Sequence, residues 1–101
     1  MRPIHLVHLD KVRPAVILTR EEVRPFRSQL TIAPITTTVR GLPSEVPVGR
    51  ANGLDHECVA NCDNIVTVPT DAIGRLVGHL TTAQEHALTQ AIRDAFDLLP
   101  D

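Results

Sequence analysis

The chain has 101 residues, a mass of 11.1 kDa and a formal charge of −2, which suits one domain over residues 1–101 with one hydrophobic core. Hydrophobic residues make up 43% and charged residues 22% of the chain, and this composition excludes intrinsic disorder. The sequence contains neither an apolar run of the roughly 20 residues that span a membrane nor the apolar segment of a secretory signal.

Short β-strands are predicted over most of the chain, because 24 of its 28 Val, Ile and Thr residues precede residue 78. The first two strands are predicted over residues 4–9 and 15–19. Only Asp10–Arg13 joins them, which favours a tight antiparallel hairpin. Arg20–Phe26 is polar and contains a proline, so it predicts a loop or a single helical turn.

A third strand is predicted over Gln29–Thr36, where Pro34 indicates a sheet edge or a bulge. The remaining pattern alternates turns with strands. It predicts a turn at Thr38–Pro43, a short strand at Glu45–Val48 with Pro47 exposed, a turn at Asn52–Gly53, a long strand at Cys58–Val68, a helical turn from Pro69 that Gly74 ends, and a last strand at Arg75–Leu80.

The hydrophobic period then changes from 2 to 3.6, which predicts a helix running to about Leu98. Thr81 and Gln84 form a capping box at its start. One stripe of this helix is apolar and comprises Leu88, Ala91, Ile92, Ala95 and Leu99. Because a lone amphipathic helix must cover something, we expect it to pack on the sheet, giving a mainly β fold that is a small curled antiparallel barrel.

Cys58 and Cys62 are the only cysteines, and both lie in the predicted long strand. Four strand steps separate them by about 13 Å, which is too far for a disulfide or a shared metal. Two unpaired thiols are typical of a reducing compartment, so we expect a cytoplasmic protein. The five histidines show no metal-ligand spacing, and His5 and His8 point to opposite faces of one strand, so no metal site is predicted.

The charge is unevenly distributed along the chain. Residues 11–50 carry seven bases and three acids, for +4, whereas residues 51–101 carry two bases and eight acids, for −6. Nine of the ten bases are arginines, which suit bidentate contact with phosphate. Two interpretations stay open at this point, a surface that binds a polyanion and an ordinary solvated face.

Six segments occur in an order and spacing that closely resemble the MazF/PemK family of toxin endoribonucleases, from about Ile4 to Leu99. They are RPAVIL from Arg13, TIAPIT from Thr31, LPSEVPV from Leu42, NGLD from Asn52, the stretch from Cys58-Val59 through DNIVTV, and GRLVGHLT from Gly74.

This resemblance implies an SH3-like barrel of five to seven strands with a C-terminal helix, which dimerises. It implies the toxin of a type II toxin–antitoxin system, neutralised by a small MazE-like antitoxin. The toxin would cleave single-stranded RNA at short sequences. Its target would be mRNA, with rRNA or tRNA as alternatives. Cleavage would need no metal or other cofactor, would leave 2′,3′-cyclic phosphate and 5′-OH ends, and would inhibit translation and growth.

In the family, the Arg of the Arg-Pro strand start and the Thr of the Pro-Ile-Thr strand end carry the chemistry, and these map to Arg13 and Thr36. Further RNA contacts are expected from Lys11, Thr37, Thr38, Arg40, Asp63 and Asn64. RNA supplies its own nucleophile in the 2′-OH, so the protein must align the reacting oxygens, donate to the phosphate and move protons. An arginine with a pKa above about 12 suits electrostatic work better than proton transfer. From the residues alone, a solvated hairpin position for Arg13 and an ordinary strand end for Thr36 are favoured, because both residue types are common at such positions. The resemblance to the family reverses that preference.

The chain departs from the family pattern in three places. It begins Arg2-Pro3-Ile4-His5-Leu6 where family members usually have an Arg-Gly-Asp-Ile/Val-aromatic strand. The family has a long loop between its first two strands that covers the active site, whereas only Asp10-Lys11-Val12 stands here, which predicts a more open site. The family's acidic-Gln-Ile-Arg-Thr run appears as Asp63-Asn64-Ile65-Val66-Thr67, with a shorter amide and no arginine. Base reading from this strand is therefore expected to differ.

Aromatic side chains for base stacking are scarce, because the chain has no Tyr or Trp and only two Phe residues. Phe96 is predicted to lie in the core. Phe26, between Arg24 and Arg27, is interpreted as a loop anchor, with contact to a base as the alternative.

Two other functions are compatible with the same fold. One is a CcdB-like gyrase inhibitor, which acts through a C-terminal Trp-Gly-Ile that this chain lacks. The other is a catalytically weak barrel that binds RNA or titrates antitoxins, which the short loop favours. A dimer would extend the track for RNA, and the antitoxin would use a disordered acidic or amphipathic tail.

Overall fold

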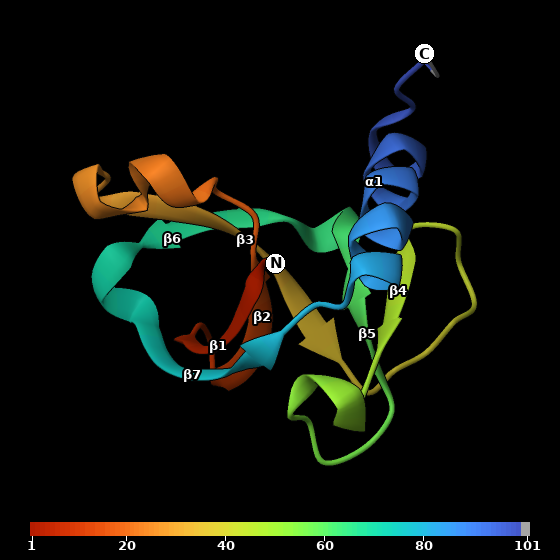
Figure 1. Cartoon of the computed structure of the whole chain (residues 1–101), viewed down its shortest axis with the longest axis horizontal. Helices are drawn as coiled ribbons and strands as arrows, with labels where there is room; N and C mark the ends of the chain where they lie inside the picture. Colours follow the sequence, from red (N-terminus) through yellow and green to blue (C-terminus); the bar gives the residue numbers. More distant parts are fainter. Residues whose placement is uncertain (100–101) are drawn as a thin grey trace.

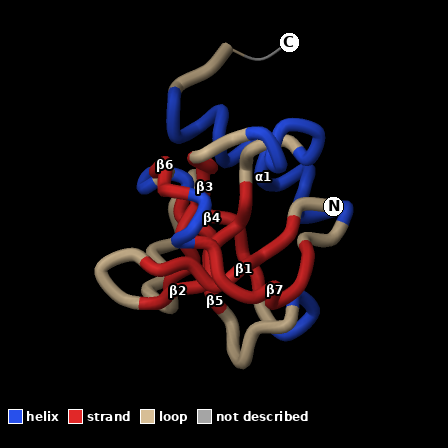
Figure 2. Tube along the Cα trace, turned by 90° about the vertical axis from the view of Figure 1, so that its left-hand side faces the viewer, coloured by secondary structure: helices blue, strands red, loops and turns tan. Residues whose placement is uncertain are grey.

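The computed structural model describes residues 1–99, which form seven strands and one α-helix (Figure 1). The strands are β1 (Pro3–His8), β2 (Val12–Ile17), β3 (Gln29–Thr36), β4 (Glu45–Val48), β5 (Cys58–Asn61), β6 (Val66–Pro69) and β7 (Ile73–His79), and the helix is α1 (Thr82–Phe96). The sheet curls on itself, and α1 stands beside β4 and β5 at one side of it (Figures 1 and 2). Among the described residues, no helix is long and apolar enough to cross a membrane.

Every strand pairing is antiparallel, in the order β4-β5-β3-β2-β1-β7. Strand β3 is central: one edge pairs with β2, and the other pairs with β6 along Gln29–Ile32 and with β5 at Ile35 and Thr36. The expected curled antiparallel sheet is confirmed, and so is the β1–β2 hairpin with its three-residue connection.

The prediction of one long strand over Cys58–Val68 is wrong, because a 3-10 turn at Cys62–Asn64 divides this segment into β5 and β6. The Asn61 Oδ1 atom accepts the Asp63 N–H at 2.9 Å, and this local bond competes with the strand ladder. Opposite the turn, β3 has no pairing to β5 or β6 at Ala33 or Pro34. Pro34 therefore marks an irregularity in a central strand and not a sheet edge.

Several other boundaries differ from the expectation. Strand β1 spans Pro3–His8 and not residues 4–9, and β7 spans Ile73–His79 and not Arg75–Leu80. Strand β2 spans Val12–Ile17 and not residues 15–19. It ends before Leu18 because the successive N–H groups of Leu18 and Thr19 both donate to the Thr31 carbonyl, which interrupts the regular ladder with β3. Gly74 does not end the helical turn, which covers Thr70–Ala72, but lies within β7. A Cβ atom on Gly74 would lie 3.0 Å from the Leu6 carbonyl oxygen, so glycine permits close approach of β7 to β1.

The core has two parts on opposite faces of the sheet. One lies between the sheet and α1 and includes Val16, Val46 and Leu88, and the other lies inside the curl and includes Ala15 and Ile17. Alternate residues of β2 therefore enter different clusters. Burial on both faces is the reason that this strand reads as a continuous apolar run.

Helix α1 begins with the predicted capping box, in which the Thr81 hydroxyl accepts the Gln84 N–H and the Gln84 side chain accepts the Thr81 N–H. The helix ends at Phe96, two residues earlier than expected. Phe96 is 56% exposed and Leu99 is 89% exposed, so the expectations of a core Phe96 and of Leu99 on the buried stripe are wrong. The reason is geometric, because the last turn of α1 projects beyond the strands (Figure 1).

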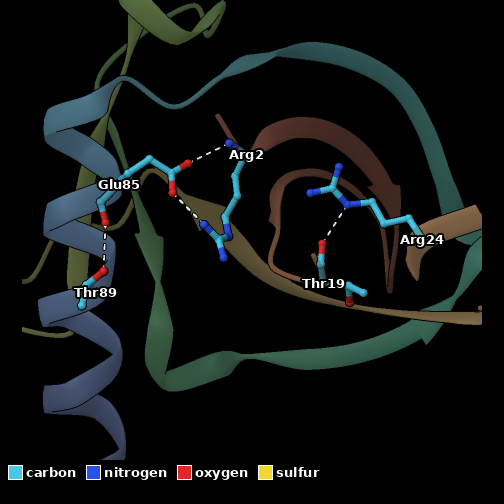
Figure 3. A network of polar contacts seen from close by, with 5 residues as sticks. All are labelled: Arg2, Thr19, Arg24, Glu85 and Thr89. Carbon is cyan, nitrogen blue, oxygen red and sulfur yellow. Dashed lines mark hydrogen bonds and ion pairs between the residues drawn. The ribbon is translucent and has the colours of Figure 1, made fainter. Parts of the chain in front are cut away.

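The start of β1 is fastened to α1 by a charged pair (Figure 3). The Arg2 backbone N–H and its Nη1 atom donate to the two carboxylate oxygens of Glu85, at 2.7 and 2.6 Å. The Thr89 hydroxyl donates to the Glu85 carbonyl one turn later at 3.3 Å. This contact joins residues 83 positions apart and fixes the helix against the sheet.

The 3-10 turn Glu21–Phe26 follows β2, so the predicted helical turn is confirmed. Phe26 is 84% exposed, and its interpretation as a loop anchor is therefore wrong. The turn is held instead by Arg24, whose Nε donates to the Thr19 carbonyl at 2.7 Å (Figure 3).

Candidate functional site

An open pocket of about 400 Å³ lies where β2, the end of β3 and the turn after β5 converge. Five of the eight predicted site residues line it: Arg13, Thr36, Thr38, Arg40 and Asn64. They come from three separate parts of the chain, so only the fold brings their donor groups together.

Arg13 is positioned by the short β1–β2 hairpin. Its backbone pairs with Val7 of β1, and its Nε lies 3.5 Å from the Asp10 carboxylate. The Lys11 N–H donates to that carboxylate and Arg13 also interacts with it, and together they lower the pKa of Asp10 below its ordinary value. A guanidinium has five N–H donors, so this one contact leaves donors for a phosphate.

Thr36 is the last residue of β3, and its side chain is partly exposed at the pocket. Its Oγ1 atom accepts the N–H of Thr38 at 3.1 Å, which turns the chain out of the strand. A hydroxyl that accepts one bond still has its proton to donate. Thr36 can therefore donate to a phosphate that Arg13 binds.

Glu45 holds the loop that carries Thr38 and Arg40. Glu45 is buried, with 9% of the residue exposed. Its carboxylate accepts the backbone N–H groups of Arg40, Gly41 and Leu42, and the shortest bond to each is 3.2, 2.9 and 3.2 Å long. Gly41 has a φ of +73°, which favours glycine in this turn. From the sequence, Glu45 was identified only as the start of a strand and as part of the LPSEVPV segment. Its one available signal was an acid two residues after a glycine-containing turn.

The turn Cys62–Asn64 contributes amides to the pocket. Asn64, one of the predicted site residues, lines it, and Asn61, which was not among them, lines it as well. Asp63 does not line the pocket, because its Oδ2 atom accepts the Ser44 hydroxyl at 2.5 Å. Asp63 thereby joins this turn to the residue before β4.

Lys11 and Thr37 lie on the other side of the Arg13–Thr36 pair. Both line a second pocket, and Arg13 and Thr36 line that pocket too. The pair thus forms the boundary between two adjoining cavities. Within residues 1–99, no group of three or more His, Cys, Asp or Glu side chains is placed to hold a metal ion.

Comparison with known proteins gives consistent matches over nearly the whole chain. The family described as PemK-like, MazF-like toxin of type II toxin–antitoxin system matches residues 6–96. Endoribonuclease MazF3 of Mycobacterium tuberculosis is 57% identical over 98 residues, which cover 97% of this chain and 95% of that protein. Probable endoribonuclease MazF2 of the same species is 35% identical over 82 residues, 80% of each chain.

Solved structures also resemble this chain over nearly its whole length. The structure described as Mycobacterium tuberculosis toxin MazF-mt6 superposes with a TM-score of 0.96 at 56% identity, over 98% of this chain and all of that one. An endoribonuclease in complex with its cognate antitoxin, from a mycobacterial species, shares the fold with a TM-score of 0.85 at 24% identity, over 98% and 95% of the two chains.

Proposed function

The chain belongs to the PemK-like, MazF-like family of type II toxins, and from this premise we propose that it cleaves single-stranded RNA with Arg13 and Thr36 as its catalytic pair. The family match confirms the resemblance found in the sequence, and the fold match confirms the predicted mainly β architecture. The observation that carries the proposal is the shared pocket, in which both residues meet the donors of Thr38, Arg40 and Asn64.

The reaction is an internal transesterification. The 2′-oxygen of the RNA attacks the adjacent phosphorus, the bond to the 5′-oxygen breaks, and the products are a 2′,3′-cyclic phosphate and a 5′-OH. The 2′-OH loses its proton and the departing 5′-oxygen gains one, so protons balance. RNA supplies the nucleophile, and the protein supplies alignment and charge.

Arg13 stabilises the charge that grows on the phosphate oxygens in the transition state. Its guanidinium binds two oxygens side by side, and the Thr36 hydroxyl donates to the phosphate from the end of β3. Arginine stays protonated near neutral pH, so its contribution is electrostatic and water in the open pocket exchanges the protons. The pocket is open to water because the β1–β2 connection is too short to cover it.

The biological setting follows the same proposal. The chain acts as a cytoplasmic toxin and inhibits translation by cutting mRNA or other single-stranded RNA. A MazE-like antitoxin neutralises it, in keeping with a fold relative solved with its cognate antitoxin. Two copies form a homodimer that covers exposed apolar side chains such as Leu76 and gives RNA a longer track.

The decisive experiment is incubation of the purified chain with a long, weakly structured RNA in EDTA, followed by mapping of cut sites and end groups. Arg13→Ala and Thr36→Ala are compared with Arg27→Ala and Thr82→Ala, which remove the same side-chain types from exposed positions outside the pocket. We expect site-specific cuts with 5′-OH ends, lost in the first two variants and kept in the controls.

Two results would contradict the proposal. Equal cutting by all variants would remove Arg13 and Thr36 from the chemistry. Intact RNA with the wild-type chain would favour the alternative of a barrel that binds RNA or titrates antitoxin, which the shortened hairpin makes a specific competitor. The gyrase-inhibitor alternative gains no support from the relatives named above, which are described as endoribonucleases.

A further inference from the structure

The loop before β5 forms one wall of the second pocket, beside the Arg13–Thr36 pair. It contributes to the lining Gly53, Leu54, Asp55, His56 and Cys58. Between the 3-10 turn Arg50–Asn52 and the start of β5, the loop has neither helix nor strand to hold it. Its position next to Arg13 and Thr36 therefore depends on contacts at its ends.

Asn52 holds the start of this loop with a buried side-chain amide, since the residue is only 1% exposed. Its Oδ1 atom accepts the Gly49 N–H at 3.0 Å, and its Nδ2 atom donates to the His79 carbonyl at 2.9 Å. A main-chain donor needs the amide oxygen and a main-chain acceptor needs the amide nitrogen, so these two partners fix the orientation of the amide.

Gln84 of α1 pairs with the same amide. The Asn52 Nδ2 atom donates to the Gln84 Oε1 atom at 2.6 Å, and the Gln84 Nε2 atom donates back to the Asn52 Oδ1 atom at 3.0 Å. The Gln84 Nε2 atom also donates to the Pro47 carbonyl of β4 at 3.2 Å. The capping box accounts for the contact of Gln84 with Thr81 but not for these bonds, which join α1 and β4 to the start of the loop.

Two glycines bring the same turn directly onto β7. Gly53 has a φ of +87°, and a Cβ atom there would collide with the Val77 carbonyl oxygen. A Cβ atom on Gly78 would collide with the Asn52 carbonyl oxygen. The backbone at Asn52 thus lies against β7, whose Arg75 and Val77 line the second pocket as well, so a shift of Asn52 would move one wall of the pocket against another.

We propose that Asn52 and Gln84 are positioning residues of the ribonuclease, whose amide pair holds the 53–58 loop beside Arg13 and Thr36. This inference rests on the proposed ribonuclease function. Neither residue lines either pocket, so both act through the loop. Arg13 and Thr36 belong to β2 and β3 and keep their places when the loop loosens. Loss of the amide pair should therefore raise KM and leave kcat nearly unchanged.

The amide pair and the helix cap use different atoms, so two variants separate them. Thr81→Ala removes the hydroxyl that accepts the Gln84 N–H, and it leaves the side-chain amide of Gln84 in place. Gln84→Glu keeps an oxygen for the Thr81 N–H, as a capping box with glutamate does. It replaces the Nε2 donor by an oxygen that faces Asn52 Oδ1, and the main chain prevents the Asn52 amide from turning to accommodate it.

The test compares Gln84→Glu with Thr81→Ala and with Glu85→Ala, which removes the neighbouring contact to Arg2 and leaves the loop untouched. Steady-state cleavage gives kcat and KM, and fluorescence anisotropy gives the affinity for an RNA made uncleavable by a 2′-deoxy residue. We expect Gln84→Glu to raise KM and weaken binding by about 5-fold, the effect of about one net hydrogen bond. Thr81→Ala and Glu85→Ala should lower Tm without changing either quantity.

Hydrogen exchange provides a readout that needs no RNA. Amides of residues 53–57 should exchange faster in Gln84→Glu than in the wild type, because the loop opens locally more often. In Thr81→Ala, faster exchange should be confined to the first turn of α1. Unchanged exchange over residues 53–57 in Gln84→Glu would overturn the inference, since the loop would then be held without the amide pair.

Two results with RNA would overturn it as well. Equal rises of KM in all three variants would show that KM follows overall stability. An unchanged KM in Gln84→Glu, with faster exchange in the loop, would show that the position of the loop does not matter to RNA. Failure of the proposed function is a different result, because the wild-type chain would then leave RNA intact whatever the exchange of the loop.

Discussion

At the scale of single residues, Glu45 shows how a buried carboxylate can position a loop of the candidate site. Its carboxylate gathers three consecutive backbone N–H groups and so fixes the loop that presents Thr38 and Arg40. Hydrogen bonds to a charged acceptor are stronger than neutral ones, and a buried donor left unpaired is costly. The order of this loop therefore depends on one side chain at the start of β4.

Glu45→Gln is expected to lower the unfolding free energy by about 1–3 kcal/mol, because the neutral amide accepts fewer and weaker bonds. RNA cleavage should fall mainly through a higher KM, since Arg40 loses its fixed position while Arg13 and Thr36 keep theirs. Denaturant titration and steady-state kinetics measure the two effects. A variant with wild-type stability and KM would show that the loop holds its shape without this carboxylate.

Cys62 provides a prediction about pH. Burial, with a smaller effect from Asp63, raises the pKa of its thiol to about 11, above the ordinary value of about 9. A raised folded-state pKa means that the stability from the neutral thiol is fully present below about pH 9 and is lost as the pH rises toward 11. Thermal unfolding measured from pH 8 to 11 should therefore show a smaller loss of Tm in Cys62→Ala than in the wild type. Parallel curves for the two proteins would contradict this coupling.

At the scale of elements, the contact between Arg2 and Glu85 joins the start of β1 to α1. Glu85→Ala removes two bonds from Arg2 at once, and we expect the unfolding free energy to fall by about 1–2 kcal/mol. For a domain of this size each kcal/mol corresponds to a Tm decrease of about 4–8 °C. Calorimetry of Glu85→Ala beside Glu21→Ala, an exposed acid in the turn after β2, tests the expectation. Equal Tm values for both variants would mean that the helix docks by its apolar face alone.

The elements also show how far local sequence determines this fold. The bounds of Gln29–Thr36 and Glu45–Val48 were predictable because alternation, turn residues and proline all indicate the same strands. The break at Cys62–Asn64 was not, since the apolar residues around it read as one strand and the break depends on an Asn61 bond and on pairing with two parts of β3. The prediction that Phe96 lies in the core failed for a similar reason, because the apolar stripe of a helix does not indicate where the sheet beneath the helix ends.

The candidate site was predictable only in part. The resemblance to a toxin family indicated Arg13 and Thr36, and the fold places them in one pocket. Glu45 and Asn61 could not be identified from spacing, because their roles depend on contacts between segments that the sequence separates. Asp63 was expected to contact RNA, but its carboxylate is bonded to Ser44 outside the pocket.

At the scale of the whole molecule, the uneven charge of the sequence becomes a local feature of the surface. The formal charge of the chain is −2, yet Lys11, Arg13, Arg40 and Arg75 gather around the two adjoining pockets. A net negative protein can therefore still present a locally cationic surface to RNA at the candidate site. The polyanion interpretation of the basic half of the chain is favoured by this arrangement over that of an ordinary solvated face.

Salt dependence tests this arrangement directly. For single-stranded RNA, each phosphate contact adds about 0.7 to the negative slope of log affinity against log salt concentration. With an oligonucleotide made uncleavable by a 2′-deoxy residue, we expect Arg40→Ala and Arg75→Ala each to reduce that slope by about 0.7. Arg27→Ala should leave it unchanged, since Arg27 lines neither pocket. An acidic antitoxin tail would meet the same cations, so its binding should weaken with salt as well. An affinity for RNA or for antitoxin that stays constant from low to high salt would show that these cations do not bind that partner.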